Sequence, residues 1–329
     1  MSARSYFTTI AVTTLAFCLV SVPAENVRAQ PYPERPVKII APSAPGGGFD
    51  FVGRVLARHM SERLGQNFII ENRTGAGTLI GTQAVANAEP DGYTLLVGGL
   101  SNIVWNMALY EKPGYNAETD FVPIGLAYML PYIAVVRKDL PASTLREFID
   151  YARANPGKLN MAHAGVGAGQ HLMGVALMRQ TGITMAEVPY RGAQFVYPDL
   201  ISGRADVFFD SSPSARPHIL SGAVKALAIV SPRRSAIFPD LPTSAEASVP
   251  GWEIESWLGL FAPAKTPALI VQKLRETLAE VVKHPDVKTR FEGSAGEVFH
   301  YDIPKTEAFI KAERAKWTKL IRDASIKAQ

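Results

Sequence analysis

The sequence contains very little cysteine. Cys18 is the only cysteine among 329 residues, and it lies in an N-terminal stretch that we expect to be removed. The mature chain would then have no thiol, which excludes disulfides, cysteine catalysis and thiolate metal sites.

A strong charge of either sign is also absent. The chain has 34 Lys and Arg against 30 Asp and Glu, a formal net charge of +4. No basic run with interleaved aromatic residues is present, so we expect no nucleic-acid partner. A slight excess of positive charge suits a small anionic ligand without requiring one. Beyond the N-terminal stretch, no apolar run is long enough to cross a membrane.

The motifs of common catalytic and metal sites are missing. There is no G-x-S-x-G, S-x-x-K, H-E-x-x-H or Walker sequence. None of the six histidines pairs with another at metal-ligand spacing; they are His59, His163, His171, His218, His284 and His300. We therefore expect no catalytic residue, no metal and no cofactor.

One enzymatic alternative stays open. The run Gly75–Gly81 follows an expected strand and is close to a dinucleotide fingerprint. Its last glycine comes one residue late, and the next expected strand lacks the acidic residue that would hold the ribose. A dinucleotide-dependent cleft enzyme is the alternative that this turn allows.

The N-terminus has the pattern of a secretory signal. Arg4 precedes the apolar stretch 7–20, and Val27-Arg28-Ala29 supplies small residues at signal-peptidase spacing. A membrane anchor is the alternative, but the apolar run is short for a span. We predict a signal peptide at residues 1–29, a mature start at Gln30 and a periplasmic location.

Strand and helix patterns alternate along the rest of the chain, which predicts an α/β fold. Pro131 interrupts the long apolar stretch 121–136, which we interpret as two strands. A capping-box pattern at Ser143–Glu147 predicts a helix that ends at Pro156, and Thr266-Pro267 predicts the start of another that ends at Pro285. The other expected strands are 37–40, 68–72, 93–97, 159–162, 187–190, 207–210, 226–229 and 252–261, and the other expected helices are 52–64, 79–88, 172–177 and 309–321.

Two glycine-rich turns connect expected strands to expected helices. The first is Pro42–Asp50 with three successive glycines, and the second is Gly165–Gly169. Glycine leaves backbone N–H groups uncovered, and the positive end of a helix dipole adds to their attraction for an anion. Two such turns facing each other would form a cleft with an anion site on each wall. A tight connection without a ligand is the alternative at each turn.

Several motifs in order resemble the Bug-type substrate-binding proteins of tripartite tricarboxylate transporters, from about residue 32 to 326. These motifs are Pro45–Asp50, Glu71–Gly77, Pro90–Leu96, Pro156–Leu159, Val188–Gly192, Leu241–Thr243 and Ala262–Ala264. The resemblance implies a two-domain periplasmic-binding-protein fold of type II-like α/β architecture, with two mixed sheets flanked by helices and a ligand cleft between the domains. It places domain 1 at 30–128 and 252–329, and domain 2 at 129–251.

The resemblance also implies a function and a set of ligand-binding residues. The protein would be a non-catalytic, extracytoplasmic solute-binding protein for a small mono- or dicarboxylate, aliphatic or aromatic. Its partners would be the membrane subunits of a tripartite tricarboxylate transporter or a sensor kinase, and we expect a monomer. The implied site residues are Ser43, Pro45, Gly46, Gly47, Gly48, Asp50 and Ser101 on one wall, and Gly167, Ala168, Gly169 and Asp210 on the other.

The sequence departs from the family pattern in three places. Ser43 stands where an aromatic residue is common, and Ala168 replaces a frequent Ser or Thr, which removes one hydroxyl donor. Gln194 and Phe195 replace part of a small, proline-containing stretch. Phe195 is a candidate for contact with an aromatic ligand; packing at the hinge or exposure to solvent is the alternative.

Overall fold

The computed structural model describes residues 32–323, so the predicted signal peptide lies outside the described residues. The strands are β1 (Val37–Ala41), β2 (Phe68–Asn72), β3 (Thr94–Gly99), β4 (Phe121–Arg137), β5 (Asn160–His163), β6 (Ala186–Pro189), β7 (Val207–Ser211), β8 (Val224–Val230), β9 (Glu255–Pro263) and β10 (Glu297–Val298). The helices are α1 (Gly48–Leu64), η1 (Ala76–Thr78), α2 (Leu79–Ala86), η2 (Leu100–Trp105), α3 (Asn106–Leu109), α4 (Leu145–Ala154), α5 (Gly169–Thr181), α6 (Ala193–Ser202), α7 (Ser212–Leu220), α8 (Ala268–Val281), α9 (Pro285–Gly293) and α10 (Ile303–Asp323).

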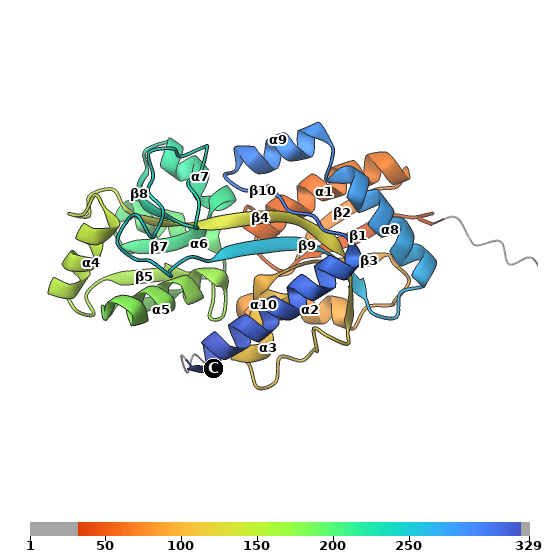
Figure 1. Ribbon diagram of the computed structural model, residues 1–329, viewed down its shortest axis with the longest axis horizontal. Coiled ribbons are helices and arrows are strands. Elements are labelled where there is room, and N and C mark those ends of the chain that lie inside the picture. Colours follow the sequence, from red (N-terminus) through yellow and green to blue (C-terminus); the bar gives the residue numbers. More distant parts are fainter. Residues whose placement is uncertain (1–31, 324–329) are drawn as a thin grey trace, which may run out of the picture. The chain divides into compact units, whose positions relative to one another are not determined.

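The two expected sheets join through β4 into one mixed sheet of order β2-β1-β3-β9-β4-β7-β5-β6, with β8 and β10 also paired to β4. Strands β1, β2 and β3 are parallel to one another, as are β5, β6 and β7, whereas β4 and β9 run antiparallel to their neighbours. Figure 1 shows β4 and β9 crossing the middle, with α4 to α7 at one end and α1, α2 and α8 at the other. We call β1, β2, β3, β9, β10 and the first part of β4 the first lobe, and β5 to β8 with the last part of β4 the second lobe. The domain boundaries given above stay predictions.

Strand β4 corrects one expectation. We predicted two strands separated by Pro131, but residues 121–137 form a single strand. Pro131 is the last residue of β4 that pairs with β9, and Tyr132 is the first that pairs with β7 and β8. Proline lacks an N–H donor, so it fits where a strand exchanges one neighbour for another. The residue therefore marks a change of partner between the lobes and not a break in the chain.

Local signals account for several helix ends. In α4, the Thr144 hydroxyl accepts from the Glu147 N–H at 3.1 Å, and the Glu147 carboxylate accepts from the Ser143 N–H at 2.7 Å, which confirms the predicted cap. Helix α8 begins later than predicted, with Pro267 as its N-cap. The predicted end at Pro285 is wrong, because α8 already ends at Val281; Pro285 instead begins α9, where the His284 imidazole accepts from the Asp286 N–H.

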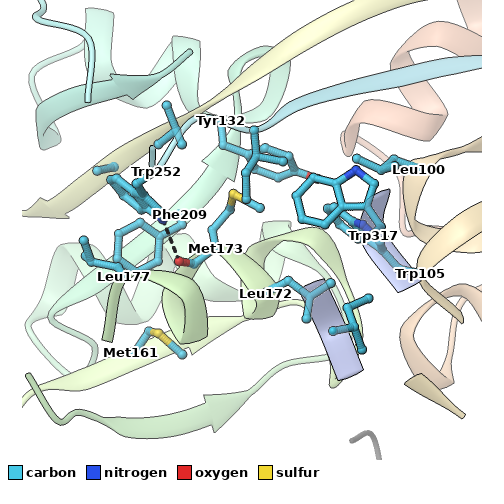
Figure 2. Close-up of a cluster of buried hydrophobic side chains, with 14 of the residues drawn as sticks. Leu100, Trp105, Tyr132, Met161, Leu172, Met173, Leu177, Phe209, Trp252 and Trp317 are labelled. Carbon is cyan, nitrogen blue, oxygen red and sulfur yellow. Dashed lines mark hydrogen bonds between the residues drawn. The ribbon is translucent and has the colours of Figure 1, made fainter. Parts of the chain in front are cut away.

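A cluster of buried hydrophobic side chains, several of them aromatic, forms much of the core (Figure 2). Trp105 of η2 meets Trp317 of α10 edge to face, with ring centroids 5.1 Å apart. In the second lobe, the indole N–H of Trp252 donates to the Met173 carbonyl at 3.0 Å, and its ring meets Phe209. The packing fixes η2 and α5, both of which contribute residues to the site described next. Among residues 32–323, no helix combines the length and apolar character needed to span a bilayer.

Candidate functional site

A cavity of about 520 Å³ lies between loops that follow strands of both lobes. This volume falls in the range of about 300–1,000 Å³ typical of small-molecule sites. Loops after β1 and β2 line it from the first lobe, and loops after β5, β6 and β7 line it from the second. Its lining includes Ser43, Gly47, Gly48, Phe49, Thr74, Gly75, Ala76, Gly77, Thr78, Ser101, Tyr110, Tyr132, Val166, Ala168, Gly169, Gln170, Tyr190, Arg191, Gly192, Ser211 and Ser256.

Five helices begin at the wall of this cavity. Their N-cap residues all line it: Gly47 of α1, Thr78 of α2, Ala168 of α5, Gly192 of α6 and Ser211 of α7. None of these five residues accepts a hydrogen bond from the helix with its own side chain. By contrast, the N-caps of α4 and α9, which lie outside the lining, do so. The cavity therefore collects several positive helix ends whose N–H groups have not been capped by a side chain.

Two backbone N–H groups of the first glycine turn already have hydrogen-bond acceptors within the protein, which the sequence did not predict. The N–H of Gly46 donates to the Asp50 carboxylate at 2.9 Å, and the N–H of Gly47 donates to the Ala44 carbonyl at 3.2 Å. Our expectation of uncovered N–H groups is therefore wrong for these two glycines. Among residues 32–323, the N–H groups of Gly48 and Phe49 in the first turn of α1 have no acceptor. The donors available to a ligand are thus the helix start and not the loop before it.

Asp50 holds this turn in place from behind the cavity wall. Its side chain is buried, and its carboxylate accepts from the Gly46 N–H, from the Arg54 guanidinium at 2.9 Å and from the Asn72 amide at 2.9 Å. Burial raises the pKa of Asp50, but the hydrogen bonds from Arg54, Gly46 and Asn72 outweigh burial and hold it below its usual value. Asp50 does not line the cavity, so its contribution is to position Gly46.

We expect Asp50→Asn to lower the free energy of unfolding by about 1–3 kcal/mol at pH 7, because an amide N–H2 would face other donors. The folded-state pKa of Asp50 is depressed, so the stabilisation by its charge is complete above the ordinary value near 3.8 and is lost as the pH falls through the lower folded value. Urea unfolding of both proteins between pH 7 and pH 3 should therefore show a difference that shrinks only below about pH 4. Asp240→Asn, at an exposed aspartate, is the control. A difference that stays constant down to pH 3 would contradict the assignment.

The second glycine turn begins α5. Ala168 and Gly169 line the cavity, whereas Gly167 lies behind them and donates its N–H to Nδ1 of His171 at 3.3 Å. Gln170 also lines the cavity, and its amide donates to Asp210 at 3.2 Å. Asp210 itself is fully buried outside the lining. Burial raises its pKa against the hydrogen bonds that it accepts.

The turn after β2, which we considered only as a dinucleotide alternative, is strained and forms part of the first wall. Four consecutive residues, Gly75, Ala76, Gly77 and Thr78, have positive φ values of 129°, 45°, 56° and 87°. A β-branched residue such as Thr78 rarely adopts this conformation, and such strain is concentrated at functional sites. All four residues line the cavity.

This loop meets the second lobe at the cavity edge. The Tyr110 hydroxyl donates to the Val166 carbonyl at 2.9 Å, which joins the two lobes. A Cβ placed on Gly77 would lie 2.1 Å from the same carbonyl oxygen. A second approach, between Ala44 and Gly192, would leave only 2.5 Å for an added Cβ. The two lobes are therefore in close contact around the cavity.

The described residues that line the cavity carry formal charge of one sign only. Among the described residues that line the cavity, none is acidic, and Arg191 is the only one with a formal charge. Within residues 32–323, Arg191 forms no ion pair. The other polar side chains of the lining are the Gln170 amide and the hydroxyl groups of Ser43, Thr74, Thr78, Ser101, Tyr110, Tyr132, Tyr190, Ser211 and Ser256.

The structure brings together Ser43, Gly47, Gly48, Ser101, Ala168 and Gly169 of the predicted site residues. Asp50, Gly167 and Asp210 lie behind the wall, and Pro45 and Gly46 lie exposed outside it. Phe195 also lies outside the lining, with 52% of its surface exposed on α6. Sequence reasoning missed Tyr110 and Arg191, and it gave the loop 75–78 a role only in the dinucleotide alternative. Arg191 belongs to the family motif 188–192, and this motif was the only feature of the sequence that pointed to Arg191.

A mixed sheet of this order with a cavity between loops of two lobes is the architecture of the periplasmic binding proteins, whose solved structures it resembles. Comparisons agree: a family model described as "Tripartite tricarboxylate transporter family receptor" matches residues 52–326. The chain belongs to this family of solute-binding proteins, which confirms the predicted family and fold class. A relative in Pseudomonas sp. strain P51, the UPF0065 protein in the tcbD-tcbE intergenic region, is 35% identical over 325 residues, which are 95% of this chain and 94% of that protein.

Solved structures of related proteins superpose closely. The periplasmic binding protein BugD is 36% identical with a TM-score of 0.87, and the match covers 91% of this chain and all of that one (100%). The Rhodopseudomonas palustris protein Rpa4515, solved with adipate, is 32% identical with a TM-score of 0.86, over 90% and 99% of the two chains. MatC from the same species, solved with bound malate, is 33% identical with a TM-score of 0.81, over 88% and 100%.

Proposed function

We propose that this protein captures a small carboxylate outside the cytoplasm, in the cavity between its lobes, and delivers it to the membrane subunits of a tripartite tricarboxylate transporter. The observation that carries the proposal is the set of five helix N-termini, uncapped by side chains, around a lining without an acidic residue. Each helix end stabilises a nearby negative charge by about 0.3–2 kcal/mol, and N–H groups add charge-assisted hydrogen bonds. A sensor kinase is the alternative recipient.

The second charge of a dicarboxylate has its own partner in the cavity. One carboxylate would take the N–H groups at the starts of α1 and α5, and the other would meet Arg191, whose guanidinium has no acidic partner within residues 32–323. The ligands of the two Rhodopseudomonas palustris relatives, adipate and malate, are both dicarboxylates. We therefore favour a dicarboxylate over a monocarboxylate for this chain.

Capture would work as a shift between open and closed populations. A ligand that touches both walls gains all of its contacts only when the lobes are together, so it stabilises that state. The contact of Tyr110 with Val166 belongs to the closed state. Micromolar affinity requires about 8 kcal/mol, which two charge-assisted groups and the apolar part of the cavity can supply.

The alternative reading of the Gly75–Gly81 turn as a dinucleotide site gains no support from the geometry. Gly81 lies inside α2, where an added Cβ would be 2.6 Å from the Arg73 carbonyl oxygen and 2.8 Å from Pro42. The glycine therefore allows α2 to pack against the ends of β1 and β2. Its place beside Pro42 explains the fingerprint-like spacing without a nucleotide.

The test is a thermal-shift and calorimetry screen of mono- and dicarboxylates, with neutral sugars and cations alongside. We expect dicarboxylates of about four to six carbons to raise the melting temperature and to bind at about micromolar Kd. Arg191→Gln should weaken dicarboxylate binding by about 10- to 100-fold, the value of one charge-assisted hydrogen bond, and change monocarboxylate binding little. Arg179→Gln, an exposed arginine elsewhere in the second lobe, is the matched control. Stabilisation by sugars or cations alone would refute the proposed function.

A further inference from the structure

Three potential metal ligands meet behind the second glycine turn. His163 ends β5, His171 lies in the first turn of α5, and Glu187 lies in the neighbouring strand β6. One ligand atom from each side chain lies within 4.8 Å of those from the other two. The histidines are buried, with 1% and 5% of their surfaces exposed, whereas Glu187 reaches solvent. An ion could therefore enter from the side of Glu187.

The hydrogen bonds of this cluster leave it incomplete. Nε2 of His171 lies 2.8 Å from a carboxylate oxygen of Glu187. Nδ1 of His163 is buried and makes no hydrogen bond of good geometry within the part of the chain that the structure describes, although the ring interacts with the backbone of Gly165. Buried polar atoms in folded proteins nearly always have a partner, so this nitrogen needs an explanation.

We propose that His163, His171 and Glu187 bind one divalent transition metal ion of the Zn²⁺ class. Two imidazoles and one carboxylate form a donor set that Zn²⁺, Co²⁺ and Ni²⁺ accept, whereas Mg²⁺ and Ca²⁺ prefer oxygen donors alone. Three protein ligands leave a position for water, as the exposure of Glu187 allows. This site could not be predicted from the sequence, because the two histidines are eight residues apart and only the turn between β5 and α5 brings their rings to 4.7 Å.

Occupancy of this site would change the second glycine turn. Nδ1 of His171 accepts from the Gly167 N–H, so the ring proton of neutral His171 is on Nε2 and faces Glu187. A metal ion on Nε2 would require the ring proton on Nδ1, where it would oppose the Gly167 N–H. A metal ion on Nδ1 would take the lone pair that Gly167 uses. In both cases Gly167 loses its acceptor, and the turn that begins α5 is released.

The site itself is tested without any carboxylate. Full-length mature protein without a polyhistidine tag is titrated with ZnCl₂ and CoCl₂ by calorimetry, and Co²⁺ is also followed by its visible absorption. We expect one equivalent to bind, with His163→Gln, His171→Gln and Glu187→Gln each weakening binding at least tenfold. His284→Gln is the matched control, because His284 also stacks near a second histidine, His59, at 4.4 Å. Absence of binding, or binding that the three variants do not weaken, would overturn the proposal.

The link between the metal and the turn rests on the proposed function and has a separate test. Saturating Zn²⁺ should weaken binding of the best dicarboxylate from the screen by about three- to tenfold, the effect of one lost hydrogen bond. By reciprocity, the dicarboxylate should weaken Zn²⁺ binding by the same factor. His163→Gln should abolish this effect while leaving the dicarboxylate Kd measured without metal unchanged. Equal dicarboxylate affinity with and without Zn²⁺ would overturn the link, and metal binding without any carboxylate binding would overturn the proposed function alone.

Discussion

Gly77→Ala is expected to weaken carboxylate binding by about 10- to 100-fold and to lower the stability of the free protein only by the cost of a side chain at positive φ, about 1–2 kcal/mol. A Cβ at residue 77 would lie 2.1 Å from the Val166 carbonyl oxygen, which is a backbone atom and cannot swing aside. The two residues belong to different lobes, so this clash exists only when the lobes are together. Overpacking of this kind costs about 1–3 kcal/mol, and it would act against the closed state alone.

The control for this substitution is Gly157→Ala. Gly157 has a similar positive φ of 72°, but an added Cβ there would meet no atom within 4 Å. It therefore reproduces the backbone strain without the contact between lobes. Calorimetry with the best carboxylate gives the affinities, and small-angle scattering shows whether the ligand still makes the protein more compact. Gly77→Ala with unchanged affinity would show that ligand binding does not bring these loops together.

Ala168→Asp is expected to abolish carboxylate binding while making the free protein more stable. Ala168 is the N-cap of α5 and has no side-chain bond to the helix, so an aspartate there would cap the first turn. The gain in stability should be about 0.5–2 kcal/mol. The same carboxylate would occupy the donors intended for the ligand and repel it, because Ala168 lines the cavity. Loss of about two charge-assisted hydrogen bonds corresponds to more than 100-fold in Kd.

Ala168→Asn separates charge from shape. The amide has nearly the same size as the carboxylate and caps a helix about as well, but it carries no charge. We expect it to weaken binding clearly less than Ala168→Asp in calorimetry, with a similar rise in melting temperature. Equal losses for both variants would mean that the start of α5 does not hold a negative charge.

The positions of the two glycine turns could be predicted from the sequence, because each lies between a strand and a helix whose patterns are local. The donor pattern could not. Asp50 turns back to take the Gly46 N–H, and nothing in the sequence distinguishes this from an aspartate that faces a ligand. Tertiary packing determines whether such a side chain bonds to its own loop or faces a ligand.

Residues that reach the cavity from elsewhere were also beyond prediction. Tyr110 comes from the segment after α3 and meets Val166 of the opposite lobe, a contact between residues 56 positions apart. In the loop 75–78, Ala76 and Thr78 have positive φ values, which the residue types alanine and threonine do not predict. Such conformations are imposed by tertiary contacts and override local preference.

Pro131 shows the intermediate case. The proline in the sequence correctly indicated a change in strand pairing at residue 131. Proline, however, is typical both of a strand end and of a strand that exchanges neighbours. Only the pairing of Pro131 with Glu255, next to that of Tyr132 with Ser211, identifies the second.

The helix starts around the cavity have an evolutionary consequence. Peptide N–H groups persist through almost every amino-acid replacement, so mutation of a side chain rarely removes the grip on a negative charge. The hydroxyl-bearing residues that fill the rest of the lining, by contrast, can change one at a time. Under the proposed function, a lineage with this architecture would exchange one nutrient for another acid of different length or shape without losing its capacity for acids altogether.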